Sequence, residues 1–314
     1  MKKILRAVLI LLALALILAL ILIPRITEVS SEISAPGTQY GTARFLADPE
    51  KDTLWWPGRM SHSGDEAYPF LFEDNRYQLH QALYNTFAMQ ILFRGDTLSG
   101  LLQILPAQGD SITLVLKTSM PPASNLFSRI PHYFQSLQLK KQFDHIVGSL
   151  GKALSDPKNV YGINIKKEKV QVEYLVATRK EWDHYPSTAE IYDMIHETRR
   201  YIQTQGATEE QFPMLNIRRI DSSLFAAQIA LPVNKQVPDS AQFASKWMFK
   251  GGNILSAEVT GGPSQVQKAM KQFDLYIKDF QRTPIAIPFQ SLETDRSRET
   301  DSTRWKTRIF YPVM

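Results

Sequence analysis

Few side chains in this sequence have the types that catalysis or metal binding requires, and none falls into a familiar pattern. The chain has 314 residues and no cysteine, which excludes disulfides, thiolate zinc sites and catalytic thiols. It contains no H-E-x-x-H zinc motif, no G-x-S-x-G elbow, no Walker A loop and no G-x-G-x-x-G loop. The sequence therefore assigns no catalytic residue, no metal and no cofactor. The six histidines, none at a zinc-site spacing, are His62, His80, His132, His145, His184 and His196.

Aromatic side chains are the better candidates for binding a ligand. Trp55 and Trp56 form a pair, and Trp182, Tyr185 and Trp305 follow later in the chain. Rings of this size bury a large apolar area whatever their function, so packing in the core is the alternative for each of them. Glu258, on a predicted strand, is the candidate for a charged group in a binding cleft, with a solvent-facing position as its alternative.

The N-terminus carries an apolar run that predicts a membrane anchor within residues 1–27. Residues Ala7–Ile23 are all Ala, Val, Leu or Ile, a length that just crosses a hydrocarbon core of about 30 Å. Lys2, Lys3 and Arg6 precede the run, so the remainder of the chain is expected on the far side of the membrane. We expect a single-pass protein of the bacterial inner membrane with periplasmic domains. The alternative is a cleaved signal peptide and a secreted protein.

The formal charge of +5 belongs mostly to this anchor. Of the 36 Lys and Arg residues, Lys2, Lys3, Arg6 and Arg25 flank the apolar run, which leaves 32 against 31 Asp and Glu. Later basic clusters are interspersed with acids, so the sequence shows no stripe of positive charge that would bind nucleic acid. We expect no nucleic-acid partner.

Residues 28–157 predict an antiparallel sheet closed by a long helix. Strands are expected at Val29–Ala35, Gln78–Phe93, Leu98–Leu105 and Ile112–Thr118. Apolar residues then recur at helical spacing over 126–154, with an interruption expected near Pro131. With the Trp pair between the first strand and the rest, this order resembles the helix-grip fold of the SRPBCC or START-like superfamily. The resemblance implies a ligand cavity between sheet and helix, which Trp55 and Trp56 would line.

Residues 158–314 contain an internal repeat, with units at about 166–235 and 243–314. Each unit is predicted as strand, helix, strand, strand, and each ends in Pro-Val. The opening strands are expected at Lys169–Ala177 and Asn253–Thr260, and the two helices are expected to begin with capping boxes at Ser187-x-x-Glu190 and Ser264-x-x-Gln267. We predict an α+β protein whose C-terminal domain has a pseudo-two-fold axis and a cleft where the two units meet.

This doubled order resembles the GyrI-like small-molecule-binding superfamily. The resemblance implies a strand in the second unit with a Glu and a Tyr that meet ligand cations or assist hydrolysis. The matching stretch begins at Pro288 and places Gln290 at the Glu position and Leu292 at the Tyr position. An amide carries no charge near pH 7 and Leu donates no hydrogen bond, so the family's hydrolysis and cation binding are both put in doubt.

The sequence thus predicts a membrane-anchored protein that binds a small apolar or amphipathic molecule. Two alternatives stay open: a hydrolase or cyclase acting in one of the two cavities, and an envelope scaffold that uses these folds as surfaces.

Overall fold

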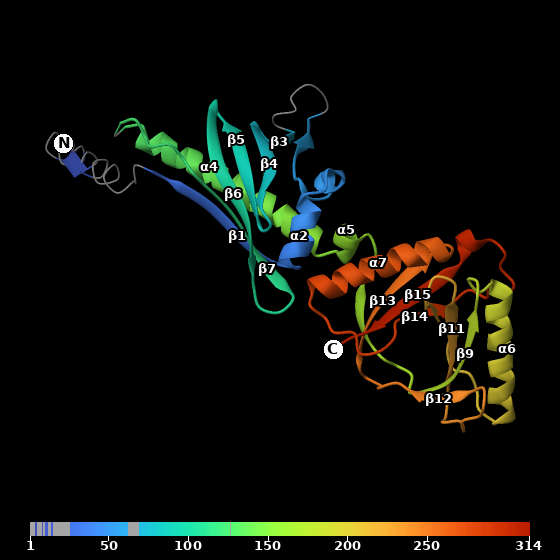
Figure 1. Cartoon of the computed structure of the whole chain (residues 1–314). Helices are drawn as coiled ribbons and strands as arrows, with labels where there is room; N and C mark the ends of the chain where they lie inside the picture. The colour runs from blue at the N-terminus through green and yellow to red at the C-terminus, as the bar shows by residue number, and fades with distance from the viewer. Residues whose placement is uncertain are drawn as a thin grey trace. The chain divides into compact units, whose positions relative to one another are not determined.

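The computed structural model describes residues 26–61, 69–125 and 127–314, together with Ile4, Val8, Ile10, Leu11 and Leu14. The chain divides into two compact units, Met1–Val160 and Tyr161–Met314, each an α+β arrangement around its own antiparallel sheet (Figure 1). Within the described part, no helix has both the length and the apolar character needed to cross a bilayer. The predicted anchor Ala7–Ile23 lies almost entirely outside the described residues.

The N-terminal unit is built on a seven-stranded antiparallel sheet. Strands adjacent in sequence from β2 to β7 are neighbours in the sheet, and β1 pairs with β7. Arg94 and Gly95 both have positive φ in the turn between β5 and β6, as the predicted tight turn requires. The strands are β1 (Glu28–Pro36), β2 (Arg59–Met60), β3 (Phe70–Phe72), β4 (Asn75–Leu83), β5 (Thr86–Phe93), β6 (Asp96–Pro106) and β7 (Ser111–Ser119).

The long helix α4 supplies much of the core of this unit. Leu139, Phe143, Ile146 and Leu150 are fully buried in the same cluster as residues of β1 and β5–β7. The other helical segments of this part of the chain are short. The helices are α2 (Gln39–Leu46), η1 (Pro49–Lys51), α3 (Asp52–Trp55), α4 (Arg129–Leu154) and α5 (Pro157–Tyr161).

Two expectations for this unit were wrong in detail. The stretch Gln78–Phe93, predicted as one strand, contains most of β4 and all of β5, which a turn at Tyr84-Asn85 joins. The helix is not interrupted at Pro131, because α4 begins at Arg129 and Pro131 lies in its first turn. Backbone N–H groups in the first turn have no intrahelical acceptor, so proline is tolerated there.

The C-terminal unit has an eight-stranded antiparallel sheet in the order β12-β9-β11-β10-β14-β15-β13-β8. The two β-α-β-β units meet where β10 pairs with β14, through Met214 with Ser291 and Leu215 with Gln290. Outward from this seam, the order is the same on both sides: the first strand after the unit's helix, its closing strand, its opening strand and a short edge strand. The two edge strands, β12 and β8, each pair with the opening strand of the other unit. The elements are β8 (Lys166–Lys169), β9 (Tyr174–Trp182), α6 (Thr188–Thr204), β10 (Met214–Arg219), β11 (Phe225–Val233), β12 (Ala244–Trp247), β13 (Asn253–Thr260), α7 (Pro263–Asp279), β14 (Phe289–Leu292), η2 (Ser302–Arg304) and β15 (Lys306–Pro312).

The two helices of this unit begin differently, although the sequence predicts capping boxes at both. Ser187 and Glu190 form the predicted capping box on α6. At α7 the prediction was wrong: the N-cap is Gly262 and Pro263 occupies the first turn. Ser264 therefore falls inside the helix, where its hydroxyl no longer precedes the free N–H groups.

Two predicted opening and closing strands also differ. Lys169–Ala177 was expected as one strand, but β8 ends at Lys169 and β9 begins at Tyr174. A single strand was likewise expected over 285–292, but only Phe289–Leu292 pairs in the sheet, as β14. Successive side chains of β14 point to opposite faces of the sheet, so its residues are divided between the two faces.

Candidate functional site

The sheet of the C-terminal unit has one face covered by helices and one face that lines an open concavity. On β11, Ala227, Ile229 and Leu231 are buried in the core that includes residues of α6, whereas Gln228 and Ala230 line a pocket on the other face. This alternation is the period of two expected of a strand. The candidate site therefore lies on the face that carries no helix.

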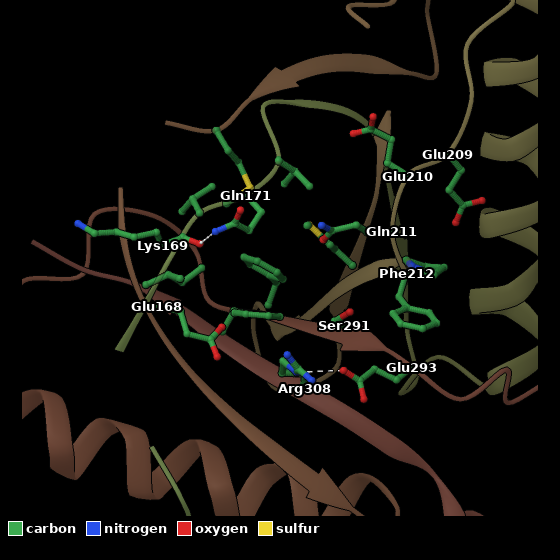
Figure 2. A pocket seen from close by; sticks show the side chains of 18 of the residues that line it. Glu168, Lys169, Gln171, Glu209, Glu210, Gln211, Phe212, Ser291, Glu293 and Arg308 are labelled. Carbon is green, nitrogen blue, oxygen red and sulfur yellow. Dashed lines mark hydrogen bonds and ion pairs between the residues drawn. The ribbon is translucent and has the colours of Figure 1, made fainter. Parts of the chain in front are cut away.

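The larger pocket on this face has a volume of about 630 Å³. Figure 2 shows Glu168, Lys169 and Gln171 on one side of it and the segment Glu209–Phe212 on the other. Ser291, Glu293 and Arg308, from β14, its following loop and β15, lie between these two sides. Both repeats thus contribute to the pocket, as the sequence predicts for a cleft between them.

A second, more apolar pocket of about 280 Å³ adjoins the first. Met214, Met248 and Phe289 line both pockets and connect them. Phe289 stacks on Phe310 with ring centroids 5.1 Å apart, which fixes the position of its ring. Methionine side chains are flexible and polarisable, so they can adapt to apolar groups of different shape.

Most charges of the larger pocket are already paired. Arg199 Nε donates to Glu209 Oε2 at 2.7 Å and Arg199 Nη2 donates to Glu209 Oε1 at 3.1 Å; these bonds raise the pKa of Arg199. Arg308 Nε lies 3.0 Å from Glu293 Oε1. Among the described residues, Glu168 and Glu210 line the pocket without an ion-pair partner. These two carboxylates, together with Lys169, Gln211 and Ser291, are the polar groups that a ligand in this pocket would meet.

Four of the residues that the sequence singled out come together on the opposite, helix-facing side. Tyr185, Gln290, Leu292 and Trp305 line a small pocket of about 50 Å³ near the starts of α6 and α7. That volume holds little more than one or two water molecules, whereas sites for drug-sized ligands usually measure about 300–1,000 Å³. The structure thus gathers these residues but leaves them outside the two larger pockets.

Arg296 also lines this small pocket. Its guanidinium lies 4.8 Å from the centre of the Trp305 ring, and its backbone N–H donates to the Tyr192 hydroxyl at 2.6 Å. Burial lowers the pKa of Arg296. Where the family resemblance implies a carboxylate for cations, this chain has a neutral amide at Gln290 and a half-buried cation, Arg296, in the same pocket.

The remaining predicted residues lie elsewhere. Trp55 is fully buried and Trp56 is 6% exposed; they pack edge to face in the core of the N-terminal unit, and Trp56 Nε1 donates to the Leu71 carbonyl at 3.0 Å. Trp182 is half-buried against the core of the C-terminal unit. The Glu258 side chain is 62% exposed and lies 3.5 Å from Arg308. Ligand binding by these four residues stays a prediction.

The sequence analysis missed the residues that line the two larger pockets. One signal was available: alternation along β14 directs Phe289, Ser291 and Glu293 to the face opposite Gln290 and Leu292. The contributions of Glu168, Glu209 and Met248 carry no such signal, since each lies at a strand end or in a connecting segment.

Comparisons with known proteins give similarities of structure alone. No protein-family model matches the sequence, and no curated protein matches it. Among solved structures, the EcmrR C-terminal domain matches with a TM-score of 0.41 and 12% identity, covering 48% of this chain and 98% of that one. A hydrolase encoded by lin2189 from Listeria innocua has a TM-score of 0.35 and 9% identity, with 48% and 91% covered. SAV2435 bound to tetraphenylphosphonium has a TM-score of 0.30 and 17% identity, with 48% and 93% covered. Each of these similarities covers about half of this chain.

Proposed function

We propose that this chain is a membrane-anchored protein that binds a small amphipathic molecule in the C-terminal unit. The observation that carries the proposal is the pair of adjoining pockets, of about 630 and 280 Å³, that share Met214, Met248 and Phe289. Their volumes fall near or within the range typical of small-molecule sites. In this proposal the unit is a GyrI-like tandem domain whose ligand lies on the helix-free face of the sheet.

The lining of the two pockets defines the class of ligand. An apolar body would lie on Met214, Met248 and Phe289, and its polar end would lie in the larger pocket near Glu168 and Glu210. Burying apolar surface contributes about 25 cal/mol per Å², so an apolar group of modest size supplies most of the affinity. Glu168 and Glu210 outnumber Lys169, which also lines this pocket without an ion pair in the part of the chain that the structure describes, so the balance of charge favours a polar end that donates hydrogen bonds or carries positive charge.

A binding role agrees better with this geometry than the hydrolase or cyclase hypothesis does. Glu258, the candidate charge of the cleft, is mostly exposed and faces Arg308, so it is not a buried base. Gln290 lines the small pocket with Tyr185, but a carboxamide neither accepts a proton nor acts as a nucleophile near pH 7.

The location of the protein and the fold family of the N-terminal unit belong to the same proposal. The anchor Ala7–Ile23 would hold the chain in the bacterial inner membrane with both units in the periplasm. The N-terminal unit would be a helix-grip domain, which is supported by the order of β1, two short helices, the remaining strands and the long helix α4.

A fluorescence titration of the full chain tests the binding site. The probes are Nile red, which is neutral, and rhodamine 6G, which is cationic and amphipathic. Met248→Ala and Phe289→Ala each remove part of the shared lining and are expected to weaken binding by about 5- to 30-fold, from the loss of about 1–2 kcal/mol of apolar contact.

Phe249→Ala is the matched control, because Phe249 is adjacent in sequence, 65% exposed and outside both pocket linings. It is expected to leave the dissociation constant unchanged. The proposal fails if neither dye binds saturably, or if Phe249→Ala weakens binding as much as Met248→Ala does.

A further inference from the structure

The helix α4 carries a second apolar stripe that does not face the sheet. Its buried stripe contains Phe143, which is fully buried. Phe134 lies nine positions earlier, about two and a half helical turns, and so points to the opposite side of the helix. Phe134 is 61% exposed, with Tyr133 40% and Leu137 38% exposed beside it. These side chains therefore contribute little to the core of the N-terminal unit.

The neighbouring residues extend this stripe and give it an amphipathic character. Ile130 lies one turn before Phe134, and Phe127, just ahead of the helix, is 76% exposed. Lys141 is exposed and lies seven positions after Phe134, on the same side of the helix. A stripe of aromatic and aliphatic residues bordered by lysine is typical of helices that lie in a membrane interface.

The position of α4 on the sheet places this stripe at the level of Ile26, which follows the end of the N-terminal apolar run in the sequence. Ser31 Oγ donates to Asp144 Oδ1 at 2.5 Å, and Gly151 lies against Ile33 and Ala35, so α4 and β1 run in the same direction. From Asp144 back to Phe134 is about 15 Å along a helix. From Ser31 back to Ile26 is about 17 Å along a strand.

Both elements run to the same end of the N-terminal unit in Figure 1. At this end the Met120 N–H donates to the Thr27 carbonyl at 3.0 Å, which fixes the start of β1 against the end of β7. Ile26 is 56% exposed there. Ala7–Ile23 precedes this position by only two residues in sequence. A bilayer spanned by Ala7–Ile23 would therefore begin within a few residues of this end of the unit.

We propose that this outward stripe of α4 lies in the boundary between lipid headgroups and acyl chains of the bilayer that residues Ala7–Ile23 span. Tyr133 suits this depth because its ring is apolar and its hydroxyl can meet the hydrated headgroups, while Phe127 and Phe134 supply apolar surface to the acyl chains. The contact fixes the orientation of the N-terminal unit to the membrane, which the anchor alone would leave free to rotate. The inference rests on the membrane anchoring proposed above and is independent of the ligand site. The stripe consists of Phe127, Ile130, Tyr133, Phe134 and Leu137.

The absence of cysteine in the chain allows a direct test by site-specific labelling. Phe134→Cys and, separately, Lys152→Cys are introduced into the full chain, labelled with bimane and reconstituted in phosphatidylcholine–phosphatidylglycerol vesicles. Lys152 is exposed and lies 18 positions, or five turns, after Phe134, so it is on the same side of α4 but about 27 Å away. It is therefore a control that differs in position along the helix alone.

Lipids brominated in their acyl chains are expected to quench the label at Phe134→Cys about twofold, since interfacial helices insert about 5–10 Å. The label at Lys152→Cys is expected to keep its fluorescence. Adding Tyr133→Ser to Phe134→Cys is expected to reduce the quenching, because it removes an aromatic anchor.

Vesicle flotation of the same samples separates the two proposals. Protein that floats with unquenched labels at both positions overturns the interfacial contact and leaves the anchor intact. Equal quenching at both positions also overturns the contact, since the label in the stripe would then be no closer to the acyl chains than the label at Lys152→Cys. Protein that does not float overturns the anchor, and the interfacial contact with it.

Discussion

The capping box on α6 and its failed counterpart on α7 offer a matched pair of substitutions. Ser187 Oγ accepts from the Glu190 backbone N–H at 3.3 Å and donates to Glu190 Oε2 at 2.7 Å. Ser187→Ala removes both bonds. The Ser187 backbone N–H still donates to Glu190 Oε2 at 2.7 Å, so half of the capping box survives.

The magnitude follows from what is lost. Replacing a serine N-cap by alanine usually costs about 0.5–2 kcal/mol. Because this site is exposed and the bond from the Ser187 backbone to Glu190 remains, we expect the lower half of that range, about 0.5–1 kcal/mol. That cost corresponds to a two- to fivefold increase in the population that is locally open at the start of α6.

Hydrogen–deuterium exchange read by mass spectrometry measures this population helix by helix. The peptide that covers the first two turns of α6 is expected to exchange two to five times faster in Ser187→Ala, while peptides of α7 keep their rates. Ser264→Ala is the control, since Ser264 is exposed within α7 and its side chain does not cap that helix. We expect it to change exchange in α7 by less than a factor of about two, in keeping with an ordinary surface substitution.

Equal effects of the two substitutions on their own helices would refute the reasoning. Ser187, the N-cap of α6, would then stabilise the start of its helix no more than Ser264, which does not cap α7. Faster exchange spread evenly over the whole C-terminal unit would refute it too, because loss of a cap acts on the first turn.

Two further predictions concern pH and the face of the sheet that binds ligand. Hydrogen bonds to Asp183 and Glu190 raise the pKa of His184 above its ordinary value of 6.5, so its stabilising contribution is full below pH 6.5 and is lost as pH rises through the folded-state pKa. The stability difference between wild type and His184→Asn, measured by urea unfolding, should therefore be larger at pH 5.5 than at pH 8.5; a constant difference would contradict this assignment. Ser291→Leu adds bulk to the larger pocket and should weaken dye binding by about tenfold, a steric cost of about 1–3 kcal/mol. Gln290→Leu changes the adjacent residue on the other face and should leave the dissociation constant unchanged, so a reversal of these two effects would place the ligand on the helix side.

Much of the order of elements was predictable because local patterns decide it. Asn253–Thr260 was predicted as a strand and forms β13 with those bounds, and Ser187-x-x-Glu190 starts α6 as expected. Errors arose where a nearby residue outweighed the pattern. Pro263 moved the start of α7 ahead of Ser264, and the turn at Tyr84-Asn85 divided an apolar stretch into two strands.

The site was harder to predict because its lining comes from segments far apart in sequence. Alternation on β14 assigns Gln290 and Leu292 to one face and Ser291 and Glu293 to the other. It does not say which face is filled by helices and which is open. The family resemblance drew attention to Gln290, whereas the large pockets are on the side of Ser291.

The sequence by itself determined the apolar N-terminal run, the doubled β-α-β-β order and the absence of thiol chemistry, since each depends on residue type and on spacing along the chain. The tertiary structure decided where space remains once the core is packed. α6 and α7 fill one face of the sheet around Leu292 and reduce the pocket there to about 50 Å³. The other face keeps the two larger pockets beside Met214 and Phe289. Close packing is a property of all neighbouring side chains together, so no single segment of the sequence specifies a cavity.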